Sequence, residues 1–295
     1  MCKHCQESIK SYPEYEGIED ADYVYRVRDR LRKQVLVPLH RALQLPEVQR
    51  VPSDILPHNI IESCLYGDTE EQKTVAELQW KRMVDDMLKN GSLTNCIAVL
   101  SDVSGSMIGL PMEVSVALGL LVSELSEEPW KGHVITFSEH PQLHLIEGSS
   151  LVEKSEFVRK MKWGCNTDFQ RVFDEMLEVA VAAKLSEDQM IRTVFVFSDM
   201  EFDAASMNPW ETDYMVIQRK FKKNGYERVP DIVFWNLRNS FSTPVTGTQN
   251  GVAMLSGYSK NLLILFLKGG GEINPEIVLE SVISGNEYQK LVVYD

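Results

Sequence analysis

The sequence predicts an α/β protein built on an open, mostly parallel sheet with helices on both faces. From residue 95 onward, short apolar segments alternate with segments whose apolar residues recur at helical spacing, which is the pattern of βαβ units. The strand segments are apolar almost throughout, as expected for strands covered on both faces. One closely spaced pair of segments, 133–138 and 142–147, predicts a hairpin that supplies an antiparallel edge strand.

The strand and helix segments of this region follow one another in a regular order. Strands are expected at 96–102, 133–138, 142–147, 193–198, 231–237 and 252–255. Helices are expected at 112–125 and 169–183, where apolar residues recur at i, i+3, i+4 and i+7. A further helix is expected to end near Lys268, before three consecutive glycines.

The first 92 residues have a different, purely helical pattern. Helices are expected within 20–45, around 59–66 and over 73–89. Pro38 should kink or end the first of these, and Gly91 should terminate the last. We therefore expect an N-terminal helical segment over residues 1–92 and an α/β domain over residues 93–295.

Composition restricts the class of protein. The chain of 295 residues is 44% hydrophobic, so it can form a core, and its formal charge of -13 disfavours a general nucleic-acid or anionic-membrane binder. No apolar run is long enough to span a bilayer, the start does not resemble a signal peptide, and five cysteines do not make a disulfide framework. These features favour an intracellular protein, cytoplasmic or nuclear, with no membrane partner.

Polar side chains follow three of the expected elements at one edge of the sheet. Asp102, Ser104 and Ser106 come directly after the first strand, at every second position. Thr167 and Asp168 precede the helix at 169–183, and the fourth strand is followed by three acidic residues, Asp199, Glu201 and Asp203. Ligands of open α/β sheets bind outside the carboxyl ends of the strands, so these loops are where a site is expected.

Two interpretations of the first loop compete. Asp and Ser favour tight turns, and a polar turn would explain Asp102 and the two serines alone. It does not explain the matching hydroxyl and carboxylate groups after two other elements. Such hard oxygen ligands suit Mg²⁺ or Mn²⁺, and alternate residues of an extended loop point the same way.

This arrangement resembles the metal-ion-dependent adhesion site of a von Willebrand factor A-type domain, whose motif is Asp-x-Ser-x-Ser followed by a Thr and an Asp. The "TD" pair and the "SDMEF" string are similar to the intracellular branch that includes the Ro ribonucleoproteins. The chain is more similar still to the plant and fungal domain-of-unknown-function family 2828, in the segments "YRVRDRLRKQVLVPL", "VAELQWKRMVDDML", "GLPMEVSVALGLLVSELSEEPWKG", "TDFQRVFD" and "FVFSDMEFD". That family has a longer helical N-terminal region, so residues 1–92 resemble a remnant of one.

The resemblance implies a six-stranded von Willebrand A (Rossmann-like) sheet. It also implies a site in which Asp102, Ser104 and Ser106 are metal ligands, with Thr167 and Asp199 contacting the ion directly or through water. Arg238 and Ser240, after the fifth strand, are candidates for the rim of the site, as are Asp168, Glu201 and Asp203.

The function expected from such a site is recognition of an acidic group on a macromolecular partner through Mg²⁺ or Mn²⁺. A protein ligand that presents a carboxylate is the first choice, and RNA or a ribonucleoprotein is the second. Two alternatives to a binding module stay open: a phosphoesterase that uses the acidic cluster to hold two metal ions, and a scaffold with a vestigial site. No histidine in the three loops could shuttle a proton, which favours a non-enzymatic role.

Overall fold

The computed structural model describes residues 20–33, 37, 55–101, 107–137, 140–161, 169–200, 210–238 and 251–267. The chain divides into two compact units, residues 1–50 and residues 51–295. The first unit contains helix α2 (Asp20–Leu31), in whose last turns Asp29 forms an ion pair with Lys33 at 2.7 Å. The side chain of Tyr25 on this helix is 73% exposed.

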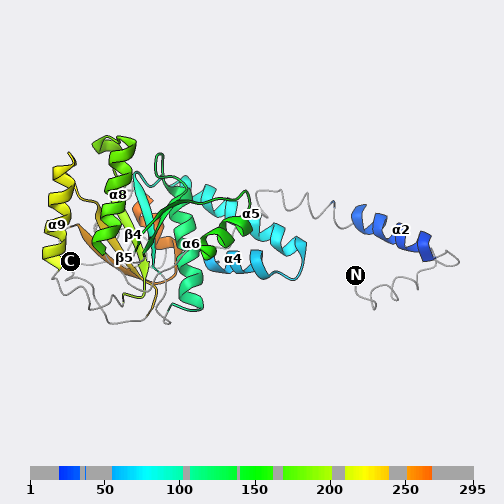
Figure 1. The fold of residues 1–295 in the computed structure, drawn as a ribbon. Coiled ribbons are helices and arrows are strands. Elements are labelled where there is room, and N and C mark those ends of the chain that lie inside the picture. The colour runs from blue at the N-terminus through cyan, green and yellow to red at the C-terminus, as the bar shows by residue number, and fades with distance from the viewer. Residues whose placement is uncertain are drawn as a thin grey trace, which may run out of the picture. The chain divides into compact units, whose positions relative to one another are not determined.

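The second unit is an α/β fold around a six-stranded sheet, as the sequence predicts (Figure 1). Its strands are β1 (Cys96–Ser101), β2 (His133–Phe137), β3 (Leu143–Leu145), β4 (Thr193–Ser198), β5 (Asp231–Asn236) and β6 (Val252–Ser256). The order across the sheet is β3-β2-β1-β4-β5-β6. All neighbours are parallel except β2 and β3, which form the expected antiparallel edge.

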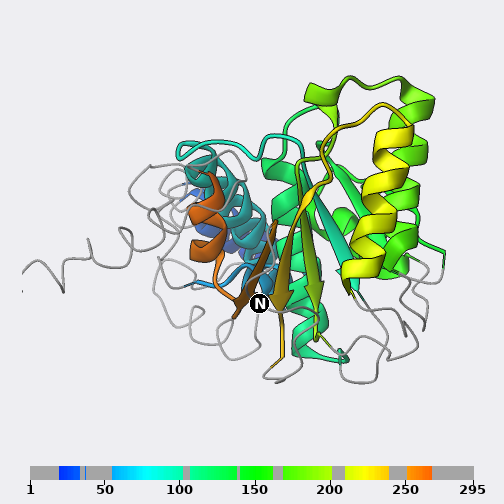
Figure 2. The ribbon, with the colours of Figure 1, turned by 90° about the vertical axis from the view of Figure 1, so that its left-hand side faces the viewer.

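Helices cover both faces of this sheet (Figure 2). One face packs against α4 (Pro57–Tyr66), α5 (Glu70–Leu88), α6 (Leu110–Leu125), α7 (Leu151–Lys160) and α10 (Lys260–Leu267). The other face packs against α8 (Phe169–Ala183) and α9 (Trp210–Lys223). Successive residues of β1 alternate between the two cores, since Ala98 and Leu100 belong to the first and Ile97 and Val99 to the second.

Helix α6 lies very close to the central strand. All its residues from Val114 to Val122 are buried, and a Cβ at Gly119 would lie 2.5 Å from Cδ2 of Leu100 on β1. A glycine is therefore required if helix and strand are to approach this closely. The contact fixes α6, and with it the end of the loop that connects β1 to α6.

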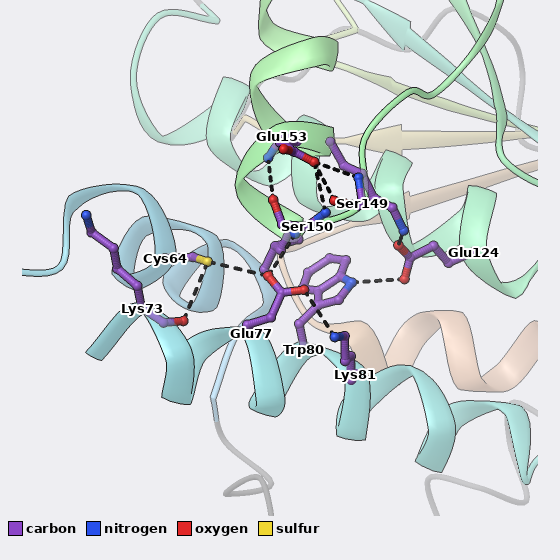
Figure 3. Close-up of polar contacts among 11 residues, drawn as sticks. Cys64, Lys73, Glu77, Trp80, Lys81, Glu124, Ser149, Ser150 and Glu153 are labelled. Carbon is purple, nitrogen blue, oxygen red and sulfur yellow. Dashed lines mark hydrogen bonds and ion pairs between the residues drawn. The ribbon is translucent and has the colours of Figure 1, made fainter. Parts of the chain in front are cut away.

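Helices α4 and α5 are part of the same compact unit as the sheet. Figure 3 shows the polar contacts that join α5 to its neighbours: the indole Nε1 of Trp80 donates to Glu124 of α6 at 2.9 Å, and Glu77 accepts the backbone N–H of Leu151 of α7 at 2.8 Å. Residues 57–88 therefore share a hydrophobic core with the α/β domain. The domain boundary that the sequence suggests, between residues 92 and 93, stays a prediction.

Two helices were not expected from the sequence. Helix α7 begins with a reciprocal capping box, in which Ser150 accepts from the N–H of Glu153 at 3.2 Å and the Glu153 side chain accepts from the N–H of Ser150 at 3.3 Å. Helix α9 lies between β4 and β5. Helix α5 also begins three residues earlier than expected, because Thr69 and Gln72 form a second capping box.

Among the residues that the structure describes, no helix combines the length and the apolar character needed to cross a membrane.

Candidate functional site

The order of the strands places the topological switch point of the sheet between β1 and β4. From β1 the chain continues outward through β2 and β3, and then returns to the other side of β1 as β4, β5 and β6. The helices that follow these two adjacent strands, α6 and α9, pack on opposite faces of the sheet. In open α/β sheets ligands bind at this switch point, outside the carboxyl ends of the strands.

Asp199 is the candidate ligand that the structure describes at this point. It directly follows β4, and only 3% of its surface is exposed. The hydroxyl of Ser198 lies 3.4 Å from Oδ1 of Asp199, and it also accepts the backbone N–H of Met200 at 3.2 Å. Buried carboxylates in proteins are paired with other groups or coordinate metal ions, so the donor chemistry here fits a hard cation.

The backbone beside Asp199 adopts an uncommon conformation. Met200 has a φ of 64°, in the left-handed region that side chains with a Cβ rarely adopt, and its side chain is buried. Such local strain is concentrated at functional sites, where the surrounding structure maintains it.

The end of β5 is joined to the end of β4 at the same edge. The backbone N–H of Leu237 donates to the carbonyl of Ser198 at 2.9 Å, and the N–H of the next residue, Arg238, donates to Oδ1 of Asn236 at 2.8 Å. Arg238 is exposed. Arg238 therefore lies just after β5, one strand away from β4 and Asp199.

The remaining candidate site residues lie outside the described residues: Asp102, Ser104, Ser106, Thr167, Asp168, Glu201, Asp203 and Ser240. The described elements nevertheless locate the ends of their loops. Leu100 on β1 is the register partner of Phe197 on β4. Asp102 comes two positions after Leu100, and Asp199 comes two positions after Phe197. Within the described ranges, no group of three or more His, Cys, Asp or Glu side chains could hold a metal ion.

The described cysteines are structural. Cys64 and Cys96 are free and buried. Burial, together with the nearby Glu77 carboxylate, raises the pKa of the Cys64 thiol to about 11, and burial raises the pKa of Cys96 to about 12. Both thiols are therefore protonated near neutral pH, and neither is an activated nucleophile.

The strand order and the position of Asp199 together define a doubly wound α/β protein with a buried carboxylate at its topological switch point. The chain belongs to the family described as "Domain of unknown function (DUF7788)", whose family model matches residues 95–291. The matching model carries this description and not that of family 2828, which stays a prediction from the sequence.

Two known proteins are similar to the chain. Uncharacterized protein L728 of Acanthamoeba polyphaga mimivirus is 40% identical over 231 residues, which cover 78% of this chain and 40% of that protein. The crystal structure of the Ro (RSR) protein of Deinococcus radiodurans matches with a TM-score of 0.48 at 14% identity, over 90% of this chain and 53% of that one. The chain thus spans less than two thirds of either relative.

Proposed function

We propose that the chain is a metal-dependent binding module, not an enzyme. In this proposal Asp102, Ser104 and Ser106 after β1, Thr167 before α8, and Asp199 after β4 hold a Mg²⁺ or Mn²⁺ ion at the carboxyl edge of the sheet. A bound ion of this kind offers an open coordination position to a carboxylate of a partner protein.

The observation that carries this proposal is the position of Asp199. Its carboxyl group is buried at the end of β4, beside the end of β1, at the switch point where this fold class binds its ligands. A buried carboxylate is costly unless a hydrogen-bond donor or a cation compensates it. The resemblance of the loop sequences to a metal-ion-dependent adhesion site supplies the remaining oxygen ligands.

Calorimetric titration of the metal-stripped protein with Mg²⁺ and Mn²⁺ tests the site directly. We expect saturable binding in the wild type and its loss in Asp199→Asn and in Asp102→Ala, because each change removes a carboxylate ligand. Asp188→Asn is the matched control, since Asp188 is exposed on the short 3₁₀ segment that precedes β4, at the opposite edge of the sheet. Saturable binding that persists in both site variants would refute the assignment.

The partner is tested by capture on the immobilised protein with Mg²⁺ or with EDTA. A partner bound through the metal should be released by EDTA and should not be captured by Asp199→Asn. A partner that remains bound under both conditions would contradict a metal-bridged contact.

A further inference from the structure

Helix α9 presents a basic face to solvent. The residues of this face recur at i, i+4, i+7 and i+8: Met215, Arg219, Lys222 and Lys223. All four are exposed, and the exposed fraction of Met215 is 57%. The opposite side of the helix carries Ile217 and Phe221, which are buried in the core beneath it. We call the four exposed residues the basic face, which combines three cations with one exposed apolar side chain.

The three cations of the basic face have no carboxylate partner among the described residues. The neighbouring Lys220 does have one, because its Nζ lies 2.7 Å from both carboxylate oxygens of Asp174 on α8. Nε of Arg219 donates to the carbonyl of Met215 at 3.2 Å, and the chain has no acidic residue between Met215 and Asn224. The positive charge of this face is therefore uncompensated, in a protein whose formal net charge is -13.

The turn between α4 and α5 has the opposite charge. Tyr66, the last residue of α4, is 67% exposed. The acidic residues that follow it are exposed as well: Asp68, Glu70 and Glu71. Glu70 forms an ion pair with Lys73 at 3.0 Å, whereas Asp68 and Glu71 have no cationic partner in the described parts of the chain. We call Tyr66 and these three residues the acidic turn, which combines three carboxylates with one exposed aromatic ring.

The backbone of the acidic turn is fixed by its own hydrogen bonds. The N–H of Gly67 donates to the carbonyl of Ser63 at 3.1 Å, and a Cβ at Gly67 would lie 2.5 Å from that oxygen. Thr69 and Gln72 then form the reciprocal capping box that starts α5, with bonds of 3.2 and 3.3 Å. A partner therefore meets a preformed surface, and binding does not have to order this backbone.

The acidic turn and the basic face lie on opposite sides of the sheet. Helices α4 and α5 pack on one face of the sheet and α9 packs on the other (Figure 1). One copy of the chain cannot bring the two surfaces together, but two copies can. We propose that the acidic turn of one copy binds the basic face of a second copy. This inference goes beyond the proposed metal site and does not depend on it.

The two surfaces match in charge and in apolar character. Three carboxylates would meet three cations, and Tyr66 would meet Met215. The basic face extends about 12 Å along the axis of α9, because eight residues at 1.5 Å each separate its ends. Acidic residues at the start of a helix and basic residues at its end also stabilise that helix itself. Such stabilisation does not require an exposed ring and an exposed thioether beside the charges, whereas contacts between a methionine and an aromatic ring are favourable in an interface.

Contact between two different surfaces determines the kind of assembly. Each pair of copies keeps one free acidic turn and one free basic face, so association continues as an open chain unless it closes into a ring. Species larger than a dimer are therefore expected. Exposed ion pairs contribute little individually and are screened by salt, so the association should be weak and should decrease as the salt concentration rises.

Sedimentation velocity of the full chain tests this assembly. The measurements are made in EDTA, which removes any metal bridge between copies, at low salt and at protein concentrations from about 1 μM to about 1 mM. We expect the sedimentation coefficient of the wild type to rise with concentration and to return to that of a monomer at high salt. A wild type that stays monomeric over the whole range, or that associates only when Mg²⁺ is present, would overturn the inference.

Charge reversal on either surface should weaken the association. Lys222→Glu combined with Lys223→Glu changes the basic face, and Glu70→Lys combined with Glu71→Lys changes the acidic turn. Each double variant should raise the dissociation constant about tenfold or more, because two attractions are replaced by repulsions. All four residues are exposed, so the thermal melts of the variants should match that of the wild type.

Lys131→Glu combined with Lys184→Glu is the matched control. Both lysines are exposed outside α9 and the acidic turn, and the change in net charge equals that of the basic-face variant. We expect this control to associate as the wild type does. Equal weakening in the control would show that net charge alone governs the association, and would overturn the specific contact.

A mixture of the two double variants is the decisive measurement. The variant with the reversed basic face keeps a normal acidic turn, and the variant with the reversed acidic turn keeps a normal basic face. Each variant alone should remain monomeric, whereas an equal mixture should associate as the wild type does. Variants that associate alone like the wild type, or a mixture that stays monomeric, would contradict pairing of these two surfaces.

Discussion

Asp199 combines a carboxyl group with almost complete burial. Only 3% of its surface is exposed, and Ser198 is within hydrogen-bonding distance of it. Aspartates are among the residues that are almost never fully buried unless they are paired. This buried carboxyl group at the end of β4 is the described feature on which the proposed metal site rests.

His58 shows how burial of one ionisable ring affects the stability of the whole unit. It is 5% exposed near the start of α4, its ring meets Tyr258 edge-on at 6.1 Å, and Nδ1 has no hydrogen-bond partner among the described residues. Burial lowers the pKa of His58, although the carboxylates of Glu62 and Glu113 act in the opposite direction. The folded protein therefore holds this ring in its neutral form.

This burial predicts an acid-sensitive contribution to stability. The unfolded chain binds a proton at His58 near pH 6.5, whereas the folded chain does so only at a lower pH. The contribution is thus complete above about pH 6.5 and is lost as the pH falls toward the folded pKa. His58→Phe keeps a ring against Tyr258 but cannot titrate.

Urea unfolding at about pH 8 and about pH 5 measures this contribution. We expect the loss of unfolding free energy between the two pH values to be smaller in His58→Phe than in the wild type. Because the wild-type ring is neutral at the higher pH, comparison of the two proteins there isolates the packing effect of the substitution. An identical loss in both proteins would show that His58 does not contribute.

At the scale of elements, Glu77 connects three helices of one face of the sheet. Its Oε2 accepts the N–H of Leu151 at the start of α7 and lies 3.9 Å from Sγ of Cys64 on α4, while Oε1 forms an ion pair with Lys81 on α5 (Figure 3). Glu77→Ala would leave the N–H of Leu151 without this acceptor. We expect a loss of about 1–3 kcal/mol of unfolding free energy.

Glu156→Ala is the matched control for this change. Glu156 is on α7 and half-exposed, and its side chain pairs with Lys160 one turn later. An exposed pair of this kind contributes about 0.2–0.5 kcal/mol. Denaturation curves in urea should therefore separate the two variants, and equal losses would rule out a specific role for Glu77.

The strands could be predicted from the sequence because their burial is nearly complete. All six residues of β4 are buried, and β5 has four consecutive buried residues, so both appear as uninterrupted apolar runs. Helix α7 could not be predicted from periodicity, since only Leu151, Ser155 and Val158 of its ten residues are buried. The Ser150-x-x-Glu153 capping box was the available signal for it.

The positions of candidate site residues could be predicted where those residues come just after a strand. Asp199 and Arg238 each come directly or nearly directly after a buried strand, so their place at the edge follows from the strand assignment. The contact between Arg171 and His140 could not be predicted from the sequence. It depends on how the β2–β3 turn meets the start of α8, across 31 positions of the chain.

At the scale of the whole molecule, the position of α4 and α5 determines which part of the chain folds by itself. These helices bury a set of side chains against α6 and the sheet: Ile60, Ile61, Cys64, Ala76, Trp80, Met83, Val84 and Met87. Each large apolar side chain in such a set stabilises the folded state by about 1.5–3 kcal/mol. The six large ones together contribute about 9–18 kcal/mol, which is as large as the whole net stability of a typical domain, about 5–15 kcal/mol.

We therefore predict that residues 51–295 fold alone and that residues 93–295 do not. The shorter chain lacks α4 and α5, so the face of α6 that they cover would be exposed to water. Thermal melts followed by circular dichroism should show one cooperative transition for residues 51–295, at nearly the temperature of the full chain, and none for residues 93–295. A cooperative melt of the shorter chain at the same temperature would show that the α/β domain begins at residue 93 and that α4 and α5 are dispensable.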